Sequence, residues 1–219
     1  TETFNSNTQD DKLYAVTSIS NGDFMAIGIG YEYFGGSYIQ FPRLVKFNED
    51  GIIFDKTIVD TQLSINSYFQ KSDIIELSTG NLLIVAQTPS SNALLILVNQ
   101  EGELISFAKD HLNFELGGTG DSGFYSATTT NDNHILLSGY ARNGFFDNDF
   151  LLVKLDSELN FKWVEFYGPL FQGEDKAHDV LQLSNNKIVV TGFSRDVYQN
   201  DYTPTVLSYE YASGCMTSS

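Results

Sequence analysis

Cysteine is nearly absent from this sequence. Cys215, in the C-terminal stretch GCMTSS, is the only one, so the chain can form no internal disulfide and no thiolate cluster around a metal ion. The chain also lacks any run of 18 apolar residues, the length that a transmembrane helix needs. It begins at Thr1 rather than Met and shows no apolar signal segment, so we expect a soluble chain from which an upstream segment was removed.

Basic residues are scarce as well. The chain has 12 Lys and Arg against 28 Asp and Glu, which gives a formal net charge of −16. A surface of that sign repels a phosphate backbone, so nucleic acid is excluded as the expected partner. The same charge suits a secreted protein, a cation-binding surface or simple solubility.

Recognisable catalytic signatures are missing. The three histidines, His111, His134 and His178, have neither H-x-H nor H-E-x-x-H spacing, and no G-x-S-x-G or phosphate-binding glycine loop occurs. Catalysis by a pair of carboxylates stays open, because their separation is set only by the folded structure. The sequence therefore favours a protein that is not an enzyme.

Proline is also rare, with 4 residues, whereas Phe (17) and Tyr (12) are abundant. Aromatic side chains suit short, half-buried strands. With 219 residues and 42% hydrophobic content, the chain can bury a substantial core.

Four similar octets predict the architecture. They read NGDFMAIG at 21–28, TGNLLIVA at 79–86, DNHILLSG at 132–139 and NNKIVVTG at 185–192, so their starts lie 58, 53 and 53 residues apart. Each octet opens with a turn-forming pair, continues through apolar residues and ends on Gly or Ala. Regular spacing of this length is typical of a repeat fold.

Each octet is predicted to be the second strand of a four-stranded repeat. Alternating segments precede the octets at 14–19, 72–77, 125–130 and 178–183, and third strands follow at 43–47, 94–98, 151–155 and 205–209. Fourth strands are expected at 52–58, 103–109 and 161–167. The pattern predicts an all-β fold, a β-propeller of four four-stranded blades, with a β-sandwich as the alternative. We expect one domain over 1–219, with repeats at approximately 12–60, 70–111, 124–168 and 178–214, and with 1–11 as an outer strand and lead-in.

The fourth repeat is predicted to lack its outer strand, because only EYASGCMTSS follows the third. The stretch TETF at 1–4 precedes the first strand at nearly the spacing found elsewhere, since Phe4 lies 10 residues before Tyr14 and Tyr167 lies 11 before His178. We therefore expect this N-terminal strand to close the last blade and satisfy its open edge. The alternative is an arc of a larger propeller, which a homodimer would complete.

The third repeat carries a resemblance to a known family. DFLLVKLDSELNFKWVEFYG at 149–168 and EDKAHDVLQLSNNKIVVTGFS at 174–194 resemble the repeats of bacterial secreted or cell-surface β-propeller proteins of the Bacteroidetes type. Those units typically read D-x-Y/F-L-V-K-L-D, G-N-x-x-W, Y-G-G and D-G-G-Y-I-V-x-G. The second repeat lacks the Asp and the Trp, and Pro169 replaces a family glycine. The resemblance implies the fold and a secreted or cell-surface location, including attachment to the outer membrane, but no reaction.

In such a repeat the long connections gather on one face, which is where binding residues are expected. These connections span 29–42, 57–71, 109–124, 140–149, 168–177 and 193–204. Aromatic rings there can stack on sugars or anchor a protein partner, or simply pack between loops. The candidate binding residues are Tyr31, Tyr33, Phe34, Tyr38, Phe145, Phe146, Tyr198 and Tyr202, with Phe41 beside them.

Acidic side chains are the candidate metal ligands, because calcium prefers oxygen donors. They are Asp11, Asp121, Asp175, Asp73 and Asp179. No D-x-D-x-D-G stretch supports a calcium loop, and Asp is an ordinary turn residue. Asp73 and Asp179 stand at equivalent first-strand positions, where they would face a propeller channel.

Together these features predict a non-catalytic extracellular or cell-surface binding or assembly module. It would act through its long-loop face on a protein partner or glycan, with calcium as the one cofactor considered. The alternative is a carbohydrate-active enzyme, a glycoside hydrolase or lyase, with acidic residues at the channel mouth.

Overall fold

The computed structural model describes residues 11–34, 36–58, 71–87, 93–109, 121–142, 148–168, 173–196, 201–212 and 215–218. Within these ranges every regular element is a β-strand. No helix capable of crossing a membrane is found among them. The predicted closing strand at 1–4 lies outside the described residues.

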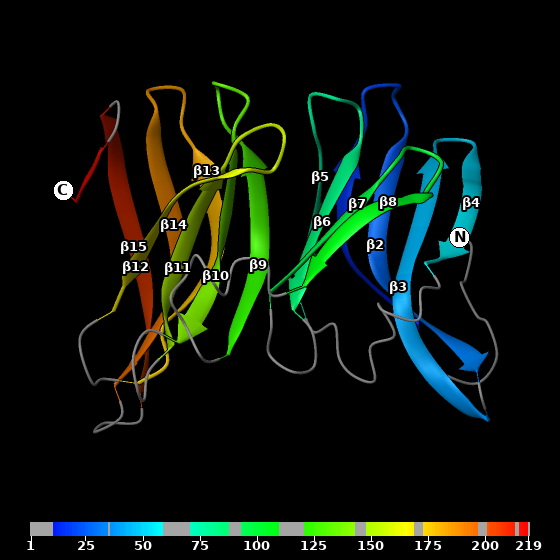
Figure 1. Cartoon of the computed structure of the whole chain (residues 1–219), viewed down its shortest axis with the longest axis horizontal. Coiled ribbons are helices and arrows are strands. Elements are labelled where there is room, and N and C mark those ends of the chain that lie inside the picture. Colours follow the sequence, from blue (N-terminus) through cyan, green and yellow to red (C-terminus); the bar gives the residue numbers. More distant parts are fainter. Residues whose placement is uncertain are drawn as a thin grey trace. The chain divides into compact units, whose positions relative to one another are not determined.

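Sixteen strands form four antiparallel sheets in the described ranges, and the strands of each sheet lie side by side in chain order (Figure 1). The first sheet contains β1 (Lys12–Ser18), β2 (Phe24–Phe34), β3 (Ser37–Asn48) and β4 (Gly51–Thr57). The second contains β5 (Ser72–Glu76), β6 (Leu82–Gln87), β7 (Ala93–Val98) and β8 (Leu104–Lys109). The third contains β9 (Ser122–Thr129), β10 (Ile135–Arg142), β11 (Asn148–Leu155) and β12 (Phe161–Tyr167). The fourth contains β13 (Lys176–Gln182), β14 (Lys187–Asp196), β15 (Asp201–Ala212) and β16 (Cys215–Ser218). The predicted four-stranded repeat is confirmed.

The fourth sheet differs from the prediction at its edge. β16 pairs with the end of β15, from Tyr209↔Ser218 to Ala212↔Cys215. The prediction that this repeat lacks an outer strand is wrong. The tail is too short and too polar to read as a strand, but pairing with β15 satisfies its backbone groups.

The chain divides into two compact units. Unit 1, Thr1–Ser90 with Leu94–Ala108, contains the first two sheets; unit 2, Ser91–Ala93 with Lys109–Ser219, contains the other two. In unit 1 strand β1 packs against β5, and in unit 2 strand β13 packs against β9 and β10. The strand that opens each repeat therefore lies at the junction of the two sheets of its unit.

Each unit has an apolar core between its two sheets. In unit 1 the core includes Met25, Ile27, Leu44, Ile74, Leu82 and Ile84. In unit 2 it includes Leu136, Phe150, Leu152, Val180, Ile188 and Val190, with Trp163 packed against them. Burying each large apolar side chain contributes roughly 1.5–3 kcal/mol. The apolar positions of the octets and the single Trp are thus structural.

A side-chain hydrogen bond links the two sheets of each unit at the short-turn end. In unit 1 the backbone N–H of Ser20 donates to Glu76 Oε2 over 2.8 Å. At the equivalent place in unit 2 the N–H of Asn131 donates to Gln182 Oε1 over 2.8 Å. Both bonds run from the first hairpin turn of one repeat to the first strand of the next.

Candidate functional site

Three of the four opening strands carry a β-bulge near the long-loop end. In β1 the register shifts between Leu13 and Ala15, and in β13 it shifts between Ala177 and Asp179. In β9 it shifts between Phe124 and Ser126, which pair with the consecutive residues Gly139 and Ser138 of β10. The extra residues are Tyr14, Tyr125 and His178. A bulge turns its extra side chain away from the regular alternation of the strand. The first strands predicted from sequence began at these residues, because the alternation of buried and exposed side chains is broken there. The strands in the structure start two or three residues earlier.

The glycine that closes three of the octets is explained by these bulges. A Cβ on Gly139 would lie 1.9 Å from the Gly123 carbonyl oxygen, and one on Gly192 would lie 2.0 Å from that of Lys176. The octet that ends on Ala86 faces a regular register, with Ser72 opposite it. Glycine is therefore required where the bulged strand approaches closely.

In unit 2 the bulged residues belong to a continuous row of rings, which we call the aromatic strip: Tyr140, Tyr125, His178, Phe193 and Tyr202. Neighbouring ring centroids lie 5.5, 5.5, 5.2 and 5.1 Å apart along this order. Successive rings meet edge to face or tilted, which is a favourable arrangement for aromatic pairs. The strip runs from the buried ring of Tyr140 to Tyr202, which is 58% exposed. It therefore reaches from the core to solvent.

Charged groups flank the strip. Lys176 Nζ lies 4.6 Å from the ring centroid of Tyr140, and the Arg195 guanidinium lies 5.4 Å from that of Tyr202. Glu174 Oε2 is 3.5 Å from Lys176 Nζ. Burial, with smaller contributions from Tyr140 and Glu174, raises the pKa of Tyr125 well above its ordinary value. The Tyr125 hydroxyl is therefore protonated at neutral pH and can donate a hydrogen bond.

Two buried carboxylates lie close together near the strip. A Cβ on Gly168 would be 2.3 Å from Asp149 Oδ1 and 2.9 Å from Asp175 Oδ2, so both side chains crowd the same point. The N–H of Asp175 donates to the Asn148 carbonyl oxygen over 2.6 Å, which ties the start of β11 to the entry of β13. Glu174, which immediately precedes Asp175 in the chain, is much more exposed than Asp149 or Asp175.

The aromatic residues predicted from sequence separate into four groups. Tyr202 joins the aromatic strip, whereas Tyr31, Tyr33 and Tyr38 lie on a β-ribbon of unit 1, so the predicted loop at 29–42 is largely strand. Phe41 is buried and cannot be a surface anchor. Phe145, Phe146, Tyr198 and the side chain of Phe34 lie outside the described residues.

Sequence reasoning missed Tyr125, Tyr140, His178 and Phe193. A signal was present, because Tyr14, Tyr125 and His178 each stand seven residues before the start of their octet. A ring at one position in three of four repeats marks the bulge.

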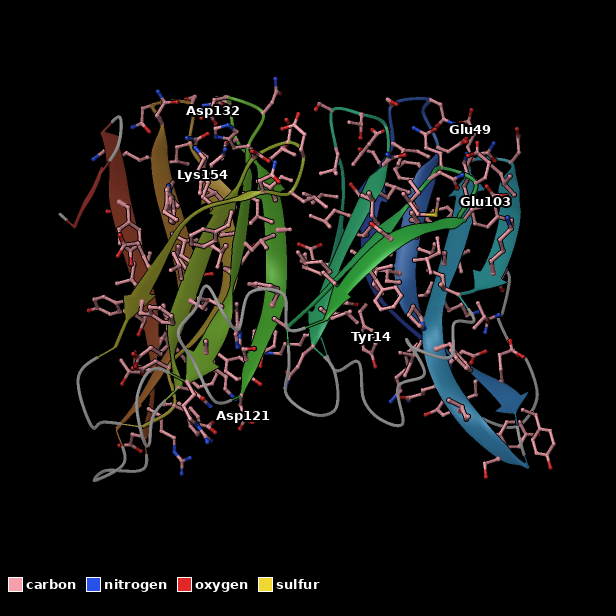
Figure 2. The ribbon with its side chains drawn as sticks, in the orientation of Figure 1. Tyr14, Glu49, Glu103, Asp121, Asp132 and Lys154 are labelled. Carbon is pink, nitrogen blue, oxygen red and sulfur yellow. The ribbon has the colours of Figure 1, made fainter. Side chains whose placement is uncertain are left out.

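The predicted metal ligands have protein partners of their own. Asp11 pairs with Arg43, and Asp121 lies 3.2 Å from Arg142 Nη2 at the long-loop end of unit 2 (Figure 2). Asp179 accepts hydrogen bonds from Ser126 Oγ at 2.8 Å and from the Val180 N–H at 2.9 Å. Asp73 accepts one from the Ile74 N–H at 2.8 Å. In the part of the chain that the structure describes, no group of three or more His, Cys, Asp or Glu side chains is arranged to hold a metal ion.

No family model matches the chain, and no curated protein sequence matches it. Solved structures do. An α-L-arabinofuranosidase from Clostridium thermocellum superposes with a TM-score of 0.56 at 9% identity, over 95% of this chain and 71% of the other. An endo-arabinase from Bacteroides thetaiotaomicron gives 0.56 at 10% identity, over 97% and 80%. An α-L-arabinofuranosidase from Fusarium graminearum, solved with arabinobiose, gives 0.57 at 14% identity, over 94% and 66%.

The fold is a β-propeller. At these identities the similarity concerns the fold alone. Each four-stranded sheet is a blade, and β1, β5, β9 and β13 are the first strands of the four blades described. The aromatic strip belongs to blades three and four, at the end where the connections between blades arrive.

Proposed function

We propose that this propeller binds carbohydrate on the aromatic strip of unit 2. The observation that carries the proposal is the unbroken row of five rings, which ends in the exposed ring of Tyr202. Sugars present apolar C–H faces that pack on aromatic rings. Their hydroxyls need a few placed polar groups, and Tyr125, Lys176 and Glu174 supply donors and an acceptor beside the rings.

The net charge of −16 argues against phosphate-bearing polymers as the ligand. Among saccharides, arabinan is the first to test, because proteins of the same fold include two α-L-arabinofuranosidases and an endo-arabinase. A polysaccharide ligand also agrees with the secreted or cell-surface location expected from the sequence, which becomes part of this proposal.

Binding is tested by affinity electrophoresis and calorimetry against linear arabinan, xylan, β-glucan and galactan. Tyr202→Ala should weaken binding of the preferred glycan roughly tenfold, because one stacked aromatic contact is worth about 1 kcal/mol or more. Tyr167→Ala is the matched control, since Tyr167 is 44% exposed and its ring meets the buried ring of Phe150, tilted at a centroid distance of 6.1 Å. Equal affinities for wild type and Tyr202→Ala would rule out the strip.

A second candidate function is glycoside hydrolysis at the same end of unit 2. It is favoured by the carboxylates gathered there, Asp149 and Asp175 against Gly168 and the more exposed Glu174 beside Tyr125. Glycoside hydrolases use two such groups, one to protonate the leaving oxygen and one to activate water or attack the sugar. Glu174, which solvent reaches, would protonate the leaving oxygen, and Asp149, the less buried member of the pair, would activate the attacking water.

Hydrolysis is tested by measuring new reducing ends after incubation with the polysaccharide that binds. Glu174→Gln should abolish product formation while leaving affinity within a few-fold of wild type, because the amide keeps the size of the side chain. Binding by the wild type without any product would leave carbohydrate recognition as the function and eliminate catalysis.

A further inference from the structure

Unit 1 carries a second aromatic surface, on a two-stranded ribbon. The pairing of β1 with β2 ends at Lys12↔Ile29, and that of β4 with β3 ends at Arg43↔Thr57. β2 and β3 nevertheless continue together as far as Phe34↔Ser37. In the described residues the ribbon thus extends past both flanking strands, and Figure 1 shows it projecting beyond the rest of the sheet.

One face of this ribbon is made of tyrosines. Tyr31 lies opposite Gln40 and Tyr33 opposite Tyr38, and residues directly opposite or two apart share a face. Tyr33 is 66% exposed and Tyr38 is 45% exposed, and their rings meet edge to face with centroids 5.3 Å apart. Gln40 Nε2 donates to the Tyr31 hydroxyl over 2.6 Å, which fixes both side chains. We call this surface the tyrosine ribbon.

The bulged residue of blade one stands at the base of the tyrosine ribbon. Burial, followed by the proximity of Tyr31, raises the pKa of Tyr14. Tyr14 is therefore near Tyr31, at the repeat position that Tyr125 and His178 occupy in the aromatic strip. The same backbone device thus starts an aromatic surface in each unit.

The chemistry of the tyrosine ribbon is neutral. Its side chains are phenols and one carboxamide, and Glu32 and Ile39 alternate onto the opposite face. In the aromatic strip, by contrast, Lys176 and Arg195 lie over ring faces. Exposed rings combined with neutral hydrogen-bonding groups suit uncharged sugars, whereas a buried protein interface would leave the phenol hydroxyls in need of matched partners.

We infer that the tyrosine ribbon is a second carbohydrate-binding site, specific for neutral sugar residues. The inference rests on the proposed function of the aromatic strip, and it names the substrate class: a neutral polysaccharide long enough to occupy both sites. Two linked sites raise the affinity for a polymer by roughly 10²–10⁴ over either site alone, provided that one chain reaches both. A short oligosaccharide gains nothing, because it fills one site at a time.

The test compares a polymer with a short fragment of it, in wild type and in Tyr33→Ala/Tyr38→Ala. The probes are linear arabinan and arabinotriose, together with the polymer and trimer of any other glycan that binds in the panel. The wild type should bind two trimers per chain, and the ribbon variant one. The affinity of the ribbon variant for the polymer should fall by a factor of ten or more, while its affinity for the trimer at the strip is unchanged.

Tyr202→Ala and Tyr167→Ala are measured in parallel. Tyr202→Ala should also reduce the affinity for the polymer, and Tyr167→Ala should not. Should the double variant lose its cooperative unfolding transition, Tyr33→Ala alone replaces it, because the Tyr33 side chain projects mostly into solvent.

The outcomes separate the two proposals. Unchanged affinity for the polymer in the ribbon variant, with Tyr202→Ala impaired, overturns the ribbon site and leaves the strip. Loss in the ribbon variant with Tyr202→Ala unaffected supports the ribbon and overturns the strip. Failure of the wild type to bind any glycan in the panel overturns both.

Discussion

At the scale of single residues, the side chains that match the family repeat best, Lys154 and Asp156, have structural roles. Lys154 is only 2% exposed, and its Nζ lies 3.0 Å from Asp132 Oδ2 at the short-turn end of unit 2 (Figure 2). Asp156 accepts the N–H groups of Glu158 and Asn160 at 3.1 and 2.8 Å, which closes the next turn. The Lys and Asp of the K-L-D stretch therefore hold turns together and take no part in the candidate site.

The Lys154–Asp132 pair predicts an acid-sensitive contribution to stability. Burial raises the pKa of Asp132, but hydrogen bonds from Thr130 and Lys154 and the charges of Lys154 and His134 outweigh it and lower the pKa to about 2. The ordinary value is 3.8, so the unfolded chain binds the proton first as the pH falls. The contribution is therefore complete above about pH 4 and is lost between about pH 4 and pH 2.

Asp132→Asn should lower the free energy of unfolding at pH 7 by about 1 kcal/mol, because Lys154 loses an anionic partner whose side chain is 46% exposed and therefore partly screened by solvent. Urea titrations of wild type and variant at pH 7 and at pH 2.5 check this, and the difference between the two curves should shrink in acid. Asp50→Asn is the matched control, since Asp50 is exposed in the turn between β3 and β4. A difference that persists unchanged at pH 2.5 would refute the ion-pair explanation.

At the scale of elements, the bulged strands decide where the rings point. The bulges at Tyr125 and His178 require Gly139 and Gly192 on the neighbouring strand, because any Cβ there would collide with a backbone carbonyl oxygen. The glycines are thus as necessary to the aromatic strip as the rings themselves.

Gly139→Ala should destabilise unit 2 by about 1–3 kcal/mol, the usual cost of overpacking, and should displace Tyr125. Thermal unfolding measures the first effect, and near-ultraviolet circular dichroism of the tyrosines measures the second. Gly30→Ala serves as the control, because the nearest neighbours of its Cβ would be side-chain atoms, Arg43 Cδ at 3.0 Å and Thr57 Oγ1 at 3.5 Å, rather than a backbone oxygen. The explanation fails if Gly139→Ala is no more destabilising than Gly30→Ala.

The order of strands could be predicted from the sequence, because four octets with turn-forming starts repeat at a nearly constant spacing. Val153 and Leu155, which lie in the predicted third strand at 151–155, are fully buried, and Trp163 packs on the core of unit 2. Periodicity reports which face of a strand is buried, and that is sufficient for the fold.

The candidate site could be predicted only in part, for physical reasons. A bulge breaks the alternation of a strand, so Tyr125 and His178 looked like ordinary strand residues. The segment 30–41 contains three glycines and many aromatics, and this composition resembles a loop until the two strands pair. The contacts between Tyr125 and His178 join blades 53 residues apart, and no local pattern encodes such a distance.

At the scale of the whole molecule, the excess of acidic residues is the dominant electrostatic feature. The net charge of −16 at pH 7 makes the compact chain repel itself, whereas most ion pairs among the described residues are partly exposed and individually weak. Salt weakens both effects, since the Debye length falls from about 30 Å at 0.01 M to about 8 Å at 0.15 M. The repulsion acts over longer distances than the pairs, so its screening should prevail.

Raising NaCl from 0.01 M to 0.15 M at pH 7 should therefore raise the melting temperature. A gain of about 1 kcal/mol corresponds to roughly 2–4 °C for a chain of this size. The same measurement near the isoelectric point of about 4.3 is the control, because the net repulsion vanishes there and salt then only weakens the remaining ion pairs. A melting temperature that falls with salt at pH 7 would mean that local pairs such as Arg142–Asp121, and not the overall charge, govern the electrostatics of the fold.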